Sequence, residues 1–148
     1  MFIELWHFYI ASGTLNKLRF YKLVKNFFGK EQYLDNVQTF HLRKAITKFR
    51  CSDHNLEVEK GRHANKRMEE RFCKACGKSI EDEIHFLNNC HSFKELRRHY
   101  FGGGPGSYNW LQIVQCVNKD NAFKLGNFLT KALKYRNKLV INSARDHS

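Results

Sequence analysis

The sequence predicts a mainly α-helical protein with little β structure, on three observations. Apolar residues recur at helical spacing in several stretches, most clearly over residues 42–49 and 125–140. Gly and Pro, which interrupt helices, are concentrated in one short run at residues 102–107. Four Cys and His residues in the middle of the chain follow the pattern C-x2-C-x8-H-x4-C, which is typical of a small metal-binding core. We therefore expect helices that flank this core and a helical lobe on its C-terminal side.

The chain is expected to divide into four parts. They are an N-terminal helical segment (1–30), a basic helix with the Cys/His core (31–101), a Gly-rich linker (102–107) and a C-terminal helical lobe (108–148). A length of 148 residues with 14% aromatic residues suits a single domain, or two small lobes, with a packed interior. The apolar run at residues 1–12 is interrupted by Glu4 and His7 and follows no basic region. We interpret it as packing surface, or the edge of something longer, rather than as a signal peptide or a membrane span.

Two helices are expected before the Cys/His core. The first begins at Thr14 or Asn16 and ends at Gly29, a residue type that favours the position just after a helix. The second has a clear apolar face at positions i, i+3, i+4 and i+7, made of Leu42, Ala45, Ile46 and Phe49. After it, apolar residues alternate with glutamates over residues 56–59, which predicts a short extended segment that ends at Gly61.

The four candidate ligands of the core are Cys73, Cys76, His85 and Cys90. Thiolate sulfur and imidazole nitrogen at this spacing are typical of a tetrahedral Zn2+ site. Because protein side chains would fill all four positions, such a zinc ion would be structural. Gly77 follows the first ligand pair and permits the turn that this pair requires.

A short helix over residues 81–89 is expected to carry the second ligand pair. Ser79 and Asp82 form a weak capping box at its start. A regular helix rotates five residues through about 500°. The last turn of this helix therefore has to unwind before His85 and Cys90 can reach one ion.

Other interpretations of these residues stay open. His91 could replace Cys90 as the fourth ligand, or the cysteines could be buried thiols beside a surface histidine. A redox C-x2-C is a further alternative, although such motifs usually open a helix within a βαβ unit, a pattern that does not surround this one. Cys51 and Cys116 are expected to be small buried hydrophobes. Five cysteines without an even disulfide framework indicate a reducing compartment, so we expect an intracellular protein, nuclear or cytoplasmic.

The remainder of the chain is expected to be helical on both sides of the linker. Ser92 is expected to cap a helix over residues 93–101. Residues 102–107 lack the Lys and Ser/Thr of a phosphate-binding P-loop, so we interpret them as a flexible connector. A short apolar helix follows, and Asp120 then caps a long helix with an apolar stripe. The stripe consists of Leu125, Phe128, Leu129, Ala132, Leu133, Leu139 and Val140.

The charge balance indicates a polyanionic partner. Lys and Arg number 26 against 14 acidic residues, which gives a net charge of +12. The cations that we expect to contact phosphates are Arg43, Lys44, Lys48, Arg50, Arg62, Lys66, Arg67, Arg97 and Arg98. Contact of this kind is poorly selective for sequence, and a solvated charged face without a ligand is the alternative. Phe72 and Tyr100 are candidates for base stacking, although such residues are more often part of a core.

Over about residues 40–101 the chain carries a set of motifs found together in one family. They are a basic helix ending in Phe-Arg, H-x-L-x-x-E-x-G-R, C-x2-C and E-D-E-x-H-F-L-x-x-C. The matching residues are Phe49, Arg50, His54, Leu56, Glu59, Gly61, Arg62, Cys73, Cys76, Glu81, Asp82, Glu83, His85, Phe86, Leu87 and Cys90. This region resembles the zinc-binding region downstream of the polymerase in reverse transcriptases of non-LTR (LINE-type) retrotransposons. One departure is that the family often has Cys-Pro where this chain has Cys90-His91.

The resemblance implies a non-catalytic role in holding template RNA or target DNA during reverse transcription primed at a nicked target. The nearest string to a polymerase Tyr-x-Asp-Asp motif, residues 33–36, lacks the second Asp. A nuclease would need a Pro-Asp and a further acid, whereas Glu95, Asp120 and Asp146 are scattered. The main alternative is a zinc-stabilised protein–protein interaction module. It predicts an exposed apolar patch and weak salt dependence, whereas nucleic-acid binding predicts an affinity that falls steeply with salt.

Overall fold

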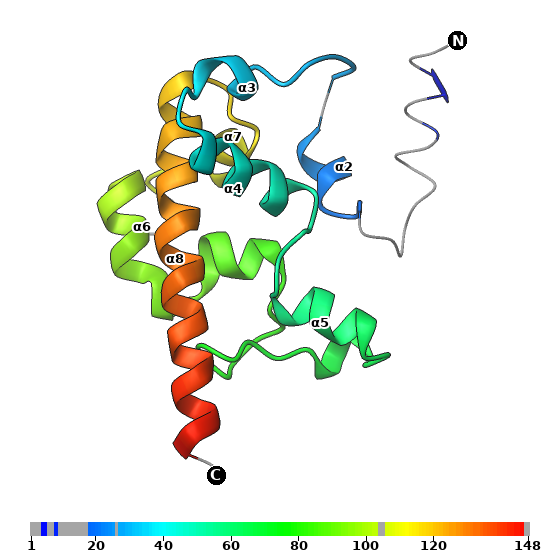
Figure 1. Ribbon diagram of the computed structural model, residues 1–148, viewed down its shortest axis with the longest axis vertical. Helices are drawn as coiled ribbons and strands as arrows, with labels where there is room; N and C mark the ends of the chain where they lie inside the picture. Colours follow the sequence, from blue (N-terminus) through cyan, green and yellow to red (C-terminus); the bar gives the residue numbers. More distant parts are fainter. Residues whose placement is uncertain (1–3, 6–7, 9–17, 26, 104–105, 147–148) are drawn as a thin grey trace.

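A computed structural model describes residues 4–5, 8, 18–25, 27–103 and 106–146. These residues form a mainly helical fold without a β-sheet, which confirms the predicted fold class. The long C-terminal helix α8 (Lys119–Asp146) runs along the molecule, and several of the shorter helices pack against it (Figure 1). Within the described residues, every helix is too short or too polar to cross a membrane.

Helix α4 (Phe40–Arg50) packs against α8 through the apolar face that the sequence predicts. Leu42, Ile46 and Phe49 are buried, and Ala45 packs against them from a half-buried position. The two helices approach closely at Gly126 of α8, where an added Cβ atom would lie 2.9 Å from the Cβ atom of Leu42. A glycine inside a helix normally lowers its stability, so we attribute Gly126 to this close approach.

Helices α6 (Lys94–Phe101) and α7 (Trp110–Val114) also pack on α8. Buried side chains from residues before and after the predicted linker form a single hydrophobic cluster. Helix α7 is capped by Asn109, whose side-chain oxygen accepts two backbone N–H groups. The start of α8 differs from the prediction, because Asn118 Oδ1 accepts from the Asn121 backbone N–H at 2.8 Å, while Asp120 already lies within the first turn.

Over residues 18–25, the structure contains less helix than the sequence predicts. Helix α2 spans only Tyr21–Val24, and the chain turns to an extended conformation at Lys25. The helix thus ends well before Gly29, and its predicted start at Thr14 or Asn16 lies outside the described residues. A second short helix, α3, covers Tyr33–Asn36 and contacts α8.

The predicted extended segment at residues 56–59 is wrong, because this stretch forms the start of helix α5 (Glu57–His63). Only Leu56, which precedes the helix, is extended. The alternation of apolar residues with glutamates suggested a strand with one buried and one exposed face. In the structure, both the apolar residues and the glutamates of this stretch are buried. Gly61 lies inside α5 against the side chain of Arg71, where a Cβ atom would come within 2.5 Å of Arg71 Cγ. Its role is close packing rather than termination.

Three shorter helical turns connect these helices. They are η1 (Met68–Glu70), the π-helical turn η2 (His85–Asn89) and η3 (His91–Phe93). The expected cap at Ser92 is wrong, since its hydroxyl instead donates to the Ala75 carbonyl at 3.0 Å. This bond ties the start of α6 to the turn that carries the first two cysteines of the core.

Candidate metal centre

A tight turn delivers the first two ligand candidates, Cys73 and Cys76. An isolated antiparallel bridge between Phe72 and Ile80 closes the base of the turn. Gly77 donates its backbone N–H to the Cys73 carbonyl at 2.7 Å and adopts φ +68°, a conformation that favours glycine. Gly77 therefore allows the turn after Cys76, as the sequence analysis predicts.

The second pair, His85 and Cys90, is brought together by the π-helical turn η2. Cys90 donates its backbone N–H to the His85 carbonyl at 2.7 Å, a bond that spans five residues. This wider turn places residues five apart on the same side, which a regular α-helix does not do. The unwinding that the sequence predicted thus takes the form of a π turn. Of the two residues of the predicted capping box, only Asp82 caps this turn, by accepting from the His85 backbone N–H at 2.7 Å. Ser79 contributes only its backbone carbonyl, which accepts from the Cys73 backbone N–H.

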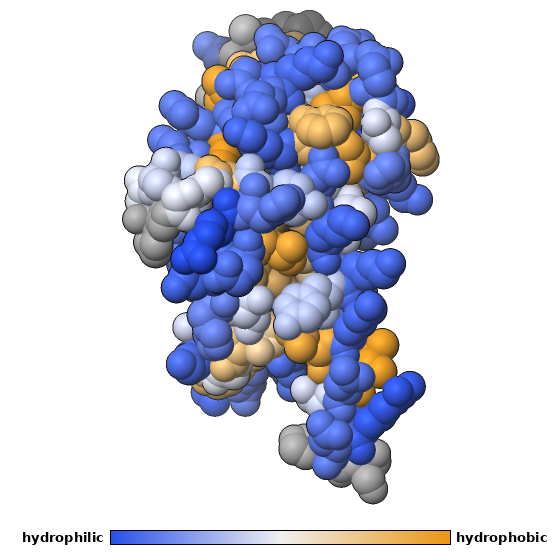
Figure 2. Space-filling view, turned by 90° about the vertical axis from the view of Figure 1, so that its left-hand side faces the viewer, coloured by the Kyte–Doolittle hydropathy of each residue, from blue (hydrophilic) through white to orange (hydrophobic). Residues whose placement is uncertain are grey.

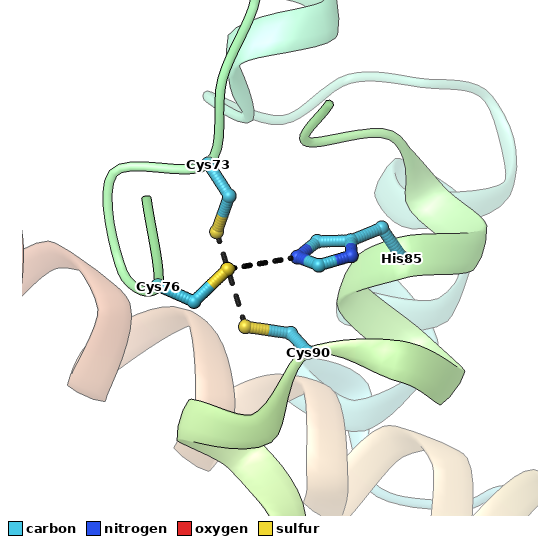
Figure 3. A group of neighbouring side chains, drawn as sticks. All are labelled: Cys73, Cys76, His85 and Cys90. Carbon is cyan, nitrogen blue, oxygen red and sulfur yellow. Dashed lines mark hydrogen bonds between the residues drawn. The ribbon is translucent and has the colours of Figure 1, made fainter. Parts of the chain in front are cut away.

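The four side chains converge on one point (Figure 3). Their ligand atoms all lie within 4.8 Å of one another. Cys73 Sγ is 3.9 Å from Cys90 Sγ, and Cys76 Sγ is 3.4 Å from His85 Nε2. Bond lengths of 2.3 Å to sulfur and 2.0–2.1 Å to nitrogen in a tetrahedron give edges of about 3.8 Å and about 3.6 Å. The four residues therefore have the geometry to bind a metal ion.

The contact between Cys73 and Cys90 shifts the pKa values of the two thiols in opposite directions. The contact with Cys90, together with burial, raises the pKa of Cys73 to about 12. The same contact lowers the pKa of Cys90 from its ordinary value. A bound cation would displace the protons of these thiols, because metal ligands must be deprotonated.

Behind Cys73 lies a buried ion pair that the sequence analysis did not assign. The carboxylate of Glu81 is 3.6 Å from Cys73 Sγ and binds Arg136 of α8 through two bonds, of 2.7 Å and 2.6 Å. It also accepts the Glu57 backbone N–H at 2.7 Å. Glu81 and Arg136 are fully buried. The available signal was the position of Arg136, four residues after Ala132 on the apolar stripe of α8.

A second buried carboxylate, Glu83, lies beside the site. It accepts from Arg19 Nη2 and the Ser52 hydroxyl, both at 2.7 Å, and contacts His54 Nε2 at 3.0 Å. Burial alone would raise the pKa of Glu83, but the bonds from His54, Arg19 and Ser52 outweigh it and hold the pKa at about 2. Arg19 also pairs with Glu59 of α5, so one guanidinium joins α5 to the segment that precedes η2.

The open alternatives for the cysteines can be compared with this geometry. The cluster contains Cys90, whereas His91 is exposed and lines a different pocket. Cys73 and Cys76 do not form a disulfide and flank no βαβ unit within the described residues. Cys116 is buried as expected, but Cys51 is only half-buried.

The nine predicted phosphate contacts fall into three groups. Those that are exposed are Lys44, Lys48, Lys66, Arg67 and Arg98. Arg43 and Arg62 are half-buried and bonded internally, Arg43 to the Val37 carbonyl at 2.8 Å and Arg62 to Glu59 at 2.8 Å. The remaining two, Arg50 and Arg97, are buried.

Burial corrects the expectation for these two arginines. Arg50 is 1% exposed and binds both carboxylate oxygens of Glu31, at 2.9 Å and 3.1 Å, so it is not available at the surface. Arg97 was also expected to contact phosphates but is only 7% exposed. Of the two stacking candidates, Phe72 is exposed, whereas Tyr100 packs against the core.

Fold and site together define a small helical protein with a Cys3His cluster suited to a metal ion. Comparison of the chain with models of protein families, with curated proteins and with solved structures finds no match.

Proposed function

We propose that the Cys3His cluster holds a structural Zn2+ ion. Three thiolates and one imidazole are a donor set that zinc prefers, and four protein ligands leave no open position for substrate. Such a centre carries one net negative charge. Zinc would join the turn that carries Cys73 and Cys76 to η2, and the ion pair of Glu81 with Arg136 connects this unit to α8.

We further propose that the chain is a non-catalytic module that holds nucleic acid. The observation that carries this proposal is the distribution of charge. Buried cations and buried carboxylates cancel within the described residues. The buried cations are Lys25, Arg50, Arg97 and Arg136, and the buried carboxylates are Glu57, Glu59, Glu81 and Glu83. The formal excess of +12 is therefore carried by residues outside the buried interior, where a polyanion can reach it.

A groove between α4 and α8 is the best candidate for part of the contact surface. Its volume is about 430 Å³, and Lys44, Lys48 and His41 stand along it. The half-buried side chains of Ala45 and Leu133 contribute apolar surface to it, above the fully buried Phe49 and Leu129. Cations beside apolar side chains suit a nucleic-acid strand, because phosphates and bases can be contacted together. Figure 2 views another side, where α6 lies, and hydrophilic residues cover most of it with only small separate hydrophobic patches.

The proposed ligand is template RNA or target DNA, held with low sequence selectivity. This choice rests on the resemblance of residues 40–101 to the zinc-binding region of retroelement reverse transcriptases. A fragment of such a protein would position nucleic acid and leave the chemistry to another part of the enzyme or to a partner.

Salt-dependent binding tests the nucleic-acid proposal. The affinity of the zinc-loaded chain for a fluorescent single-stranded oligonucleotide would be measured by anisotropy over a series of KCl concentrations. Changing Lys44 and Lys48 together to Ala should weaken binding and flatten the slope of log K against log salt by roughly 0.7–0.9 for each phosphate that the variant no longer neutralises. Binding by the unchanged chain that does not depend on salt would contradict the proposal.

A double variant of Lys30 and Lys119 is the matched control. Both lysines are exposed and lie outside the groove. Lys30 pairs with Asp35 much as Lys48 pairs with Asp53, so each double variant removes two charges and one surface ion pair. Equal slopes for the two double variants would exclude the groove as the contact surface.

One observation favours the alternative, a protein–protein interaction module. A pocket of about 480 Å³ beside the Cys3His turn is lined by Phe72, Gly77 and Val140, among others, and Phe72 is 52% exposed. An exposed aromatic ring next to an apolar hollow suits a protein partner. In that case Phe72→Ala would abolish partner binding, and the affinity would change little with salt.

A further inference from the structure

A pocket of about 340 Å³ lies beside α6, and its lining contains basic but no acidic residues. Its lining residues are Asn88, Asn89, His91, Lys94, Arg97, Arg98, Gly103 and Tyr108. Three of these residues are Lys or Arg and none is acidic. The nearest acid on α6, Glu95, is exposed and pairs with Arg98 at 3.2 Å rather than lining the pocket. A surface hollow of this composition attracts anions.

The informative residue is Arg97, which is 7% exposed although it lines the pocket. Its Nη2 donates to the Cys90 carbonyl, a neutral acceptor. Its Nη1 has no hydrogen-bond partner among the described residues. A buried donor without an acceptor is costly, so we expect a group that enters the pocket to accept from Nη1.

The other two buried arginines show what Arg97 lacks. Arg50 binds both oxygens of Glu31, and Arg136 binds both oxygens of Glu81. Each of these two also has one unpaired nitrogen, but a carboxylate balances its charge. Arg97 is thus the buried arginine of the described residues that has no carboxylate partner.

We propose that this pocket binds one phosphate group. The fork of Arg97 suits a tetrahedral oxyanion, Lys94 and Arg98 add positive charge at the rim, and the amides of Asn88 and Asn89 offer neutral donors. The pocket's chemistry stands by itself, while the source of the phosphate rests on the proposed nucleic-acid role. If that role is right, the phosphate belongs to the backbone or the end of the bound strand.

The experiment uses the zinc-loaded full chain labelled with 15N. Its side-chain amide signals at Asn88 and Asn89 would be followed by NMR during titration with inorganic phosphate, and with acetate at the same ionic strength. We expect both signals to shift and saturate with phosphate but not with acetate. Failure of phosphate to shift them, or equal shifts with acetate, would overturn the proposal.

Variants connect the response to the pocket. Arg97→Met should weaken phosphate binding about tenfold or more, as expected for loss of a charge-assisted hydrogen bond. Lys94 is exposed, so Lys94→Ala is expected to fold normally and should weaken binding several-fold. The control Lys119→Ala, also exposed but outside the pocket, should bind phosphate as the unchanged chain does. Unaltered phosphate binding in Lys94→Ala and Arg97→Met would overturn the assignment.

Further titrations identify the source of the phosphate. AMP is compared with adenosine, and an oligonucleotide with a 5′-phosphate is compared with the same strand ending in a 5′-hydroxyl. A shift that needs the 5′-phosphate assigns the pocket to strand ends, and equal shifts with both strands assign it to the backbone. A response to phosphate and AMP without any oligonucleotide binding would support the pocket and contradict the nucleic-acid role, so the two proposals fail separately.

Discussion

The buried pair of Arg136 and Glu81 should dominate the stability of the region around the cluster. Changing Arg136 to Met keeps a long side chain but leaves the Glu81 carboxylate fully buried without its two charged bonds. Its remaining donor is the Glu57 backbone N–H at 2.7 Å, because Cys73 is a thiolate when zinc is bound. Breaking one side of a buried ion pair costs about 3–5 kcal/mol, so we expect a loss of that size in the free energy of unfolding.

Urea unfolding followed by circular dichroism, at a fixed excess of zinc, measures this loss. The control is the double variant Arg136→Met with Glu81→Gln, in which the amide oxygen can still accept from Glu57 while the stranded charge is gone. It should regain part of the stability, because the stranded Glu81 charge is gone while buried Glu57 still loses its 3.6 Å contact with Arg136. A loss below about 1 kcal/mol for Arg136→Met would refute the reasoning, since that is the range of exposed pairs.

Two further changes test the fold and its charge network. Gly126→Ala should destabilise the protein by about 1–3 kcal/mol in thermal or urea unfolding, because the new Cβ atom would lie 2.9 Å from Leu42 Cβ. Helix propensity alone predicts a gain in stability for this change, and such a gain would contradict the close contact. Arg19→Met should destabilise the protein most above about pH 4.5, where Glu83 and Glu59 are ionised in the folded and unfolded states alike. The folded pKa of Glu83, about 2, lies below its ordinary value of 4.5, so its contribution is lost as the pH falls from 4.5 towards 2. The stability difference between the variant and the unchanged chain should therefore shrink on acidification, and a difference independent of pH would count against this network.

Apolar periodicity predicted the helices that matter most for the core. Most of the stripes on α4 and α8 is buried as expected, although Ala45 on α4 and Leu133, Leu139 and Val140 on α8 are half-buried. The sequence pattern over residues 56–59 predicted a strand where the structure has the start of α5, because the buried glutamates there resemble the polar face of a strand. Which arginine would neutralise each glutamate depends on contacts far apart in sequence, such as Arg136 with Glu57 and Glu81, and local patterns do not contain that information.

The arginines give a more useful lesson. Arg50 follows the buried Ile46 by four residues, Arg97 follows Phe93 by four, and Arg136 follows Ala132 by four. Each therefore continues an apolar helical face and is buried there, although charge alone suggested a surface position. An arginine in register with an apolar stripe is thus a sequence signal for a buried ion pair or a buried anion site.

The candidate cluster was predicted in full as a set of residues, because metal ligands at fixed spacing are a local property. Cys73, Cys76, His85 and Cys90 come together as their spacing indicates. The π turn that unites the last two could be anticipated only as some unwinding, since its form depends on packing around η2.

Zinc content per chain tests the central proposal most directly. The protein would be purified without added metal and measured by elemental analysis, beside Cys73→Ser, Cys76→Ser, His85→Ala, Cys90→Ser and His91→Ala. We predict one zinc ion per chain, lost or strongly reduced in the first four variants and retained in His91→Ala. Folded protein without zinc, or zinc lost in His91→Ala and kept in Cys90→Ser, would contradict the proposed centre.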